Sequence, residues 1–446
     1  MKDTLKELLG KEWKCGCGRT HRVPTKEIYC GANAKERLLR FIFAEMPGPD
    51  VAVVADTNTF AVAGQAVGEC LAENGLNVKV RLFPAGRKKL KAEKELAEKL
   101  GSELKDFHFA VACGSGTIND LVKYAATIAK IPYISYPTAP SMNGYPSPIA
   151  ALSYKGTKKT LAAIPPAAVI ADLDILRNAP EDMIQAGIGD GISKSVCNID
   201  WAVSRFIKKE YFCPLPGKMM AGVMGFYTGN AKKAAGRDPA AIKGLFEALN
   251  LAGVSMVIAG SSAPASGGEH LISHFLDMSN SSKGKDMNLH GRQVGVTTVL
   301  SAKLYEKLLK LDTDLRRLPQ LKKHYAGDRQ TKKEFMSRYG KKMAGEVYRE
   351  FMTKYLPPDK KEKELLFILK NWGKIKDMIR KNLVPSKVLE KTLRRSGAPV
   401  SFTKLAITRA VFRSAILHAR EIRGRYTVLD LAYDVDILES FANDVV

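Results

Sequence analysis

The segment FHFAVACGSGTINDLVKYAATIAK, residues 107–130, decides the fold class of this chain. It opens with an apolar run, turns at Gly114 and Gly116, and ends in a stretch with helical periodicity. A short, fully apolar run is typical of a strand buried in a parallel sheet. The order of strand, glycine-rich turn and helix therefore predicts an α/β protein.

The same alternation continues on both sides of this segment, and it changes after Pro180, where helix follows helix. Strands that alternate with helices imply a parallel, doubly wound sheet that binds its ligand at the carboxyl ends of the strands. We therefore expect an α/β domain over residues 1–178 and an all-α domain over residues 179–446. The further strand-like runs are residues 51–56, 77–84, 131–136 and 165–176.

The turn at Gly114 and Gly116 suits a phosphate. Glycine lets the backbone approach an anion, and the helix that begins near Thr117 offers free N–H groups and the positive end of its dipole. Asp56 ends an earlier strand, where a carboxylate can bind ribose hydroxyls and repel a 2′-phosphate, which favours NAD over NADP. The alternative is a tight structural turn with a capping Asp56, since the motif is not GxGxxG.

Three of the seven histidines lie in residues 266–290. His270 and His274 are four residues apart and should project from one helix face, and His290 follows a polar Gly/Lys loop. Ser266 and Glu269 have the spacing of a capping box that would start the helix. Imidazoles from a helix and a loop indicate part of a metal site. The alternative is a surface helix with hydrogen-bonded histidines.

Asp190 lies between two glycines in AGIGDGISK, residues 186–194. Glycine is a poor helix former, so three glycines in a helical segment need a reason, and close approach of a metal or substrate to Asp190 is one. Asp190, His270 and His290 would then form a ligand set with one open position. A capping or solvent-facing Asp190 is the alternative.

Cys15, Cys17 and His21 lie close together near the start of the chain, with Cys30 further on. These residues could form a small zinc site. The alternative is an ordinary loop before a strand, because C-x-C is not the usual zinc knuckle. Seven cysteines spread over 446 residues fit reduced thiols better than a disulfide framework.

The formal net charge is +24, yet most lysines stand beside glutamates on helices, as in solvated helix faces. We therefore expect no dedicated nucleic-acid binding, although a basic surface can attract a phosphorylated substrate. The sequence has no run of eighteen apolar residues and no signal-peptide core at its start, so we expect no transmembrane segment and a cytoplasmic location.

Taken together, the ordered motifs resemble the sn-glycerol-1-phosphate dehydrogenase family, and specifically its bacterial branch with a C-terminal helical extension. This family lies within the iron-alcohol-dehydrogenase and dehydroquinate-synthase superfamily. The resemblance rests on VVADTNTFAVAG, CGSGTINDLVKYAA, PTAPSMNGYPSPIAAL, AGIGDGISK, SGGEHLISHFLD, LHGRQVGV, SGAP and AREIRGRYTVLDLAYD.

The resemblance implies a dehydroquinate synthase-like fold and reversible reduction of dihydroxyacetone phosphate to sn-glycerol 1-phosphate with NADH or NADPH. It implies one divalent metal, zinc or nickel, on Asp190, His270 and His290, with His274 on the substrate side. It also implies a homodimer. The positions that match the family's nucleotide site are Asp56, Gly116, Thr117, Ile118, Asn119, Asp120, Thr138, Ala139, Pro140, Ser141 and Ser147, and Gly114 belongs to the same turn.

Asn143 departs from the family pattern, which has an aspartate at this catalytic, substrate-facing position. Asparagine keeps the size and an acceptor oxygen but loses the charge and the capacity for proton transfer. Two alternatives to the dehydrogenase remain open at this point. They are a related cyclase that uses NAD catalytically, and a nucleotide-binding homologue whose chemistry Asn143 has weakened.

Overall fold

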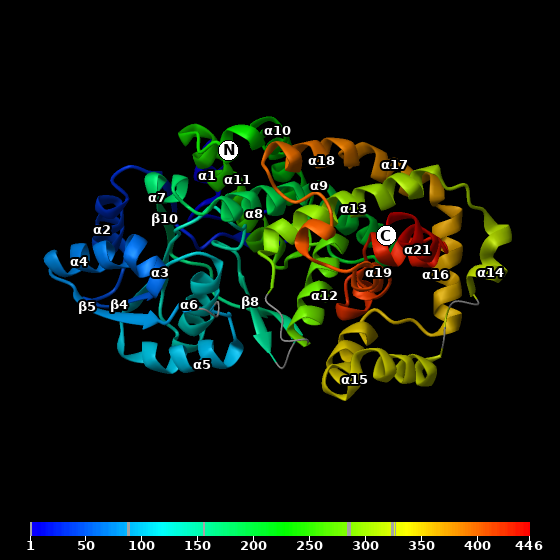
Figure 1. Cartoon of the computed structure of the whole chain (residues 1–446), viewed down its shortest axis with the longest axis horizontal. Helices are drawn as coiled ribbons and strands as arrows, with labels where there is room; N and C mark the ends of the chain where they lie inside the picture. Colours follow the sequence, from blue (N-terminus) through cyan, green and yellow to red (C-terminus); the bar gives the residue numbers. More distant parts are fainter. Residues whose placement is uncertain (1, 87–89, 155–156, 283–286, 323–324, 326) are drawn as a thin grey trace.

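The computed structural model describes residues 2–86, 90–154, 157–282, 287–322, 325 and 327–446. Part of the polar loop predicted before His290, residues 283–286, lies outside the described residues. Figure 1 shows the sheet and its helices on one side of the molecule and a larger, helical part on the other.

Six parallel strands form the central sheet, and helices cover both of its faces. Apolar side chains of α2 (Ala34–Glu45) and α4 (Gln65–Glu73) pack on one face, and those of α5 (Lys94–Glu103) and α6 (Gly116–Ala129) on the other. The predicted fold class is confirmed. The order across the sheet is β3 (Glu27–Gly31), β10 (Ala168–Asp172), β7 (Tyr133–Tyr136), β6 (Phe109–Cys113), β4 (Asp50–Asp56) and β5 (Asn77–Phe83).

Two antiparallel hairpins and edge strand β3 are additions that the sequence patterns did not predict. The hairpins lack the continuous apolar runs of the sheet, because they lie outside it. They are β1 (Glu12–Lys14) with β2 (Thr20–Arg22), and β8 (Ile149–Tyr154) with β9 (Thr157–Ala162). The short helical elements of this half are α1 (Lys2–Leu8), α3 (Thr57–Thr59), the π-helical turn η1 (Phe60–Gly64), η2 (Leu104–Asp106) and α7 (Leu173–Arg177).

The second half is helical in every described element, as expected. α11 is long and apolar enough to cross a membrane by length and composition, but 83% of its apolar window is buried inside the molecule, as in a core helix. The elements are α8 (Glu181–Ile192), α9 (Lys194–Lys208), α10 (Pro214–Ala235), α11 (Pro239–Ala259), η3 (Ala263–Ala265), α12 (Gly268–Ser282), α13 (His290–Lys310), η4 (Leu315–Arg317), α14 (Leu318–Lys322), α15 (Asp328–Met352), α16 (Pro358–Lys370), α17 (Trp372–Asn382), α18 (Ser386–Arg395), η5 (Thr403–Leu405), α19 (Arg409–His418), η6 (Ala419–Ile422), α20 (Val428–Asp434) and α21 (Leu438–Val445).

The glycines of α8 allow backbone to pack on backbone. A Cβ at Gly189 would lie 2.1 Å from the carbonyl oxygen of Gly291 on α13, and one at Gly187 would lie 1.9 Å from that of Pro140. The sequence predicted that these glycines make room for a metal or substrate. That explanation is wrong for both positions, because the neighbouring main chain already occupies the space.

We predict that Gly189→Ala destabilises the fold, because backbone atoms cannot move aside as a flexible side chain can. The expected loss is about 1–3 kcal/mol, as for other overpacked core positions. The matched control is Gly222→Ala on α10, where an added Cβ meets no atom within 4 Å. This control should gain up to about 1 kcal/mol, because alanine favours helix over glycine. Urea unfolding of both variants measures the difference, and equal stabilities would contradict the packing argument.

Candidate active site

A cavity of about 290 Å³ lies where the α/β half meets the helical half. Its walls combine the start of α6, the loop of residues 141–147, hairpin β8–β9, and helices α8, α12 and α13. Ligand clefts of doubly wound proteins lie beyond the carboxyl ends of the strands. Of the residues predicted from the sequence, the cavity is lined by Gly116, Thr117, Asp120, Ser141, Asn143, Ser147, Asp190, His270, His274 and His290.

Asp190, His270 and His290 come together at the helical wall of this cavity. One ligand atom from each lies within 4.8 Å of the others. His270 Nε2 is 3.7 Å from Asp190 Oδ1, and the rings of His270 and His290 have centroids 5.0 Å apart. Two imidazoles and a carboxylate are a donor set suited to zinc or another first-row divalent metal.

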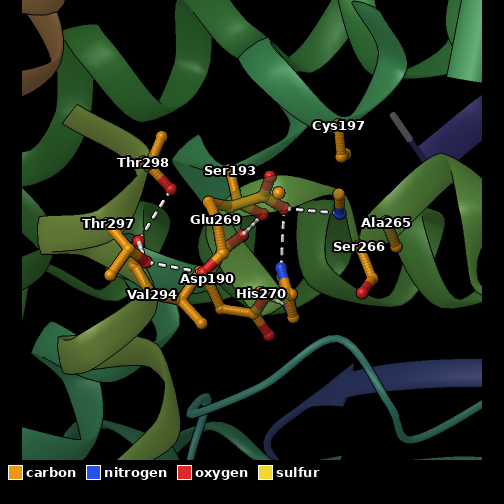
Figure 2. A network of polar contacts seen from close by, with 12 residues as sticks. Asp190, Ser193, Cys197, Ala265, Ser266, Glu269, His270, Val294, Thr297 and Thr298 are labelled. Atoms are coloured by element: carbon orange, nitrogen blue, oxygen red, sulfur yellow. Dashed lines mark hydrogen bonds and ion pairs between the residues drawn. The ribbon is translucent and has the colours of Figure 1, made fainter. Parts of the chain in front are cut away.

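A polar network fixes the orientation of two of these side chains (Figure 2). Glu269 Oε1 lies 2.7 Å from His270 Nδ1, which leaves Nε2 to face Asp190. A carboxylate behind a histidine in this way is the usual outer partner of a metal-binding imidazole. Lys194 Nζ donates to Asp190 Oδ1 at 3.2 Å, to Asp190 O at 3.0 Å and to Ala265 O at 3.1 Å.

Asn143 binds the same carboxylate. Its backbone N–H donates to Asp190 Oδ2 and its side-chain amide donates to Asp190 Oδ1, both at 2.9 Å. Asp190 is thus held by an amide, a main-chain N–H and an ammonium group. An aspartate at position 143 could not supply the side-chain donor while it is ionised.

The electrostatics keep this group in the form that binds metal. Burial lowers the pKa of His270 and of His290 to about 3, so both imidazoles are neutral. Burial alone would raise the pKa of Asp190, but the ammonium group of Lys194 and the backbone N–H of Asn143 lower it below its usual value. Neutral imidazole and ionised carboxylate are the ligand states that a metal ion needs.

His274 lies one helical turn beyond His270 and outside the group of converging ligand atoms. Its ring stacks on His290 with centroids 5.8 Å apart, and it lines the cavity. Its Nδ1 is buried with no hydrogen-bond partner among the described residues. A buried polar atom without a partner at a cavity wall points to a ligand group.

The capping box expected at Ser266 and Glu269 does not form. Helix α12 begins at Gly268, whose N–H donates to Asp200 Oδ2 at 2.7 Å, while Glu269 Oε1 accepts from the N–H of Gly267 at 2.9 Å. A carboxylate from α9, distant in sequence, therefore replaces the local cap.

Sequence reasoning missed Asp200, Lys194 and the role of Glu269. Of these three residues, only Lys194 could have been found from a local pattern, because it follows Asp190 by four residues and should lie on the same helix face. The burial of the Asp200 carboxylate, and the charge of Glu269, raise the pKa of Asp200 to about 7.

The glycine-rich turn leads directly into α6, as expected. Ser115 precedes the helix and its side chain makes no capping hydrogen bond, so the first N–H groups of α6 remain available to an anion. A Cβ at Gly116 would lie 3.3 Å from Met142 Sδ. Strand β5 lies on one side of β4 and strand β6 on the other, so the direction in which the chain crosses the sheet reverses between β4 and β6. Asp56 ends β4, and the glycine-rich turn follows β6. They therefore flank the switch point at which such sheets bind nucleotides.

The remaining residues expected at the nucleotide site do not line the cavity within the described part of the chain. Asp56 Oδ1 caps α3 by accepting from the N–H of Thr59 at 2.8 Å, so the capping alternative is also realised. Ser147, although it lines the cavity, is 1% exposed and bonds to Lys123 and to the carbonyl oxygen of Gly144. Those outside the lining are Asp56, Gly114, Ile118, Asn119, Thr138, Ala139 and Pro140.

A larger hollow of about 580 Å³ lies among the C-terminal helices, and its lining does not include His270, His274 or His290. Its charged groups are paired with one another, as in Lys361 with Asp434 and Arg338 with Glu421. The smaller cavity carries the metal-type ligands and the free helix terminus, so it is the candidate active site.

A family model described as iron-containing alcohol dehydrogenase matches residues 29–180. Among solved structures, glycerol dehydrogenase from Schizosaccharomyces pombe aligns with a TM-score of 0.60 at 14% identity, covering 94% of this chain and 90% of its own. Sulfoacetaldehyde reductase from Bifidobacterium kashiwanohense, solved with NAD⁺, aligns with a TM-score of 0.59 at 16% identity, covering 95% and 98%. These similarities show the fold of the iron-containing alcohol dehydrogenases and their structural relatives.

Sequence similarity narrows the class further. The chain is 30% identical to the NAD(P)⁺ glycerol-1-phosphate dehydrogenase of Bacillus licheniformis over 436 residues, which cover 97% of this chain and 94% of the relative. It is 36% identical to that of Halalkalibacterium halodurans over 309 residues, covering 69% and 77%. The chain belongs to the glycerol-1-phosphate dehydrogenase family, in its bacterial branch, and is an oxidoreductase. The resemblance drawn from the sequence is confirmed.

We predict that Asp190→Ala, His270→Ala and His290→Ala each bind one divalent ion fewer per chain than the unaltered protein. His274→Ala should keep that ion, because its ring lies outside the converging ligand atoms. Elemental analysis of the four purified variants measures this directly. Loss of the ion from His274→Ala with retention in His270→Ala would reverse the assignment along α12.

Proposed function

We propose that the protein reduces dihydroxyacetone phosphate reversibly to sn-glycerol 1-phosphate with NADH or NADPH. The observation that carries the proposal is the convergence of Asp190, His270 and His290 on a cavity that also receives the free start of α6. The similar proteins bear dehydrogenase names, so neither the cyclase nor the nucleotide-binding homologue is favoured.

The donor set fits a divalent metal such as zinc or nickel, held by Asp190, His270 and His290. When bound, such an ion polarises the carbonyl of the substrate as a Lewis acid. Lys194 and Asn143 fix the Asp190 carboxylate, and Glu269 fixes the His270 ring. The chain thus provides a preorganised site whose ligands need little rearrangement.

The N-terminal half fits a dinucleotide. The start of α6 at Gly116 and Thr117 offers N–H groups to the pyrophosphate, and the carboxylate of Asp56 favours NADH where a ribose would lie. The nicotinamide would then point toward the histidines across the cavity. His274 lines the cavity, and its Nδ1, which has no hydrogen-bond partner in the described part of the chain, is a candidate to bond a substrate hydroxyl.

Lys158 on β9 is the best candidate for the substrate phosphate. Two lysines line the cavity, Lys91 and Lys158, and the charge of Lys158 acts on both His274 and His290. Its ammonium has no ion-pair partner among the described residues. The next residue, Lys159, instead pairs with Glu346 at 2.7 Å and Glu350 at 3.4 Å on α15.

The decisive experiment measures NADH oxidation by the metal-loaded protein with dihydroxyacetone phosphate, followed by stereochemical analysis of the product. We predict steady turnover to the 1-phosphate. Lys158→Ala should raise the KM for this substrate about 10- to 100-fold, the worth of a lost charge-assisted hydrogen bond. It should leave the kinetics with unphosphorylated dihydroxyacetone unchanged.

Lys159→Ala is the matched control, and it should change neither KM. Formation of the 3-phosphate, or turnover without net NADH consumption, would reject the proposed reaction. Equal effects of Lys158→Ala on both substrates would show that Lys158 does not bind the phosphate. That outcome would not contradict the proposed reaction.

We propose that Asn143 positions Asp190, in addition to facing the substrate. Asn143→Ala loses the side-chain donor and should weaken metal affinity about 10- to 100-fold, as for other outer partners of metal ligands. Asn143→Asp places a carboxylate beside a divalent cation and restores a proton-transfer group, so metal occupancy should hold and kcat should rise. Metal titration and steady-state kinetics on the same preparations separate the effects. A fall in kcat for Asn143→Asp would make the asparagine part of the recognition of another substrate.

The division into domains at residues 178 and 179 stays a proposal. Leu5 and Val23 from the N-terminal segment belong to the apolar core of the helical half, so the first residues pack across that boundary. The homodimer, too, stays a prediction of the resemblance. Light scattering of the purified protein measures it.

A further inference from the structure

Four metal-type side chains meet where the N-terminal hairpin contacts the helical half, and none of them lines the candidate active site. They are Cys15, Cys17 and His21, from the turn and second strand of hairpin β1–β2, and Cys213, which directly precedes α10. One donor atom of each lies within 4.8 Å of the others. The reaction of the active site uses none of them.

Three of the distances between the donor atoms are close to those of a tetrahedral site. Around zinc, with Zn–S of about 2.3 Å and Zn–N of about 2.0 Å, two sulfurs lie about 3.8 Å apart and sulfur and nitrogen about 3.5 Å apart. Cys15 Sγ and Cys213 Sγ are 3.8 Å apart. His21 Nε2 is 3.5 Å from Cys213 Sγ and 3.2 Å from Cys17 Sγ.

The surroundings hold these groups in place. Trp13 lies beside the His21 ring with centroids 5.6 Å apart, and Tyr211 Oη lies 3.4 Å from Cys17 Sγ. The hairpin turn closes with the N–H of Cys15 donating to Arg19 O at 2.9 Å, and Gly18 takes a φ of +87° there. Backbone N–H groups two residues beyond Cys17 and Cys213 reach their sulfurs, at Arg19 and Leu215.

Cys30, which the sequence placed near this group, is not part of it. It lies on β3 in the apolar core, and burial raises its pKa to about 12. The fourth ligand comes instead from a residue 198 positions after Cys15.

We infer that Cys15, Cys17, His21 and Cys213 bind a structural zinc ion that fastens the N-terminal hairpin to the start of α10. Three thiolates and one imidazole complete the coordination, so no position is open for a substrate. His21 and Cys213 are buried, with 4% and 0% exposure, as expected for a closed site. The zinc would link these two segments at the junction of the two halves, beside the contact of Arg19 with the Tyr211 ring.

The first test uses cobalt substitution of the whole protein. Cobalt bound by thiolates gives an intense sulfur-to-metal charge-transfer band, which the Asp190/His270/His290 site has no sulfur to produce. We expect this band in the unaltered protein and in His270→Ala. We expect its loss in Cys15→Ser/Cys213→Ser. The matched control is Cys70→Ser, a half-exposed cysteine outside the cluster, which should keep the band.

The second test measures zinc release. A thiol-specific mercurial added to the purified zinc protein should release one zinc ion per chain, detected with a chromogenic chelator. The release should be complete when the three thiols of the cluster have reacted, as counted in the Cys70→Ser variant. Absence of the charge-transfer band in the unaltered protein would overturn the inference. So would an intact mass lower by two hydrogens, with Cys15 and Cys213 joined in a disulfide.

Discussion

The arrangement of the candidate active site depends on the buried negative charge of Asp190. Asp190 is 1% exposed, and a carboxylate taken out of water without partners would cost several kcal/mol. Lys194, the amide of Asn143 and the main-chain N–H of residue 143 offset that cost. The donors lie at the start of α9 and in the loop after β7, so the carboxylate on α8 ties the two halves of the chain together.

The same region brings main chain into direct contact. Glycines in α8 and at Gly291 let α13 and the Pro140 loop approach with no side chain between them. The close approach places His290, at the start of α13, against the carboxylate on α8. If α13 lay further from α8, His290 would be separated from Asp190. The close packing of these two helices is therefore needed both by the fold and by the group of metal-type ligands.

Residues near the C-terminus contact the segments that carry the site. Asp200 accepts from the N–H of Val428, and Arg425 donates to the carbonyl oxygen of Ser266. Asp200 in turn caps α12, the helix that carries His270 and His274. The last helices thus set the start of the histidine-bearing helix without contributing a ligand themselves.

The sequence by itself determined the fold class, because apolar runs and helical periodicity are local properties that each segment carries alone. It also predicted that Asp190, His270 and His290 form one group, since spacing and resemblance to a family point to these positions, and their side chains do converge. Only the tertiary structure decided that Glu269 turns His270, that Asp200 caps α12, and that Cys213 joins Cys15 in place of Cys30. It also decided that the glycines of α8 serve packing. These features arise from contacts between residues far apart in the chain, and no local pattern records which distant group will arrive.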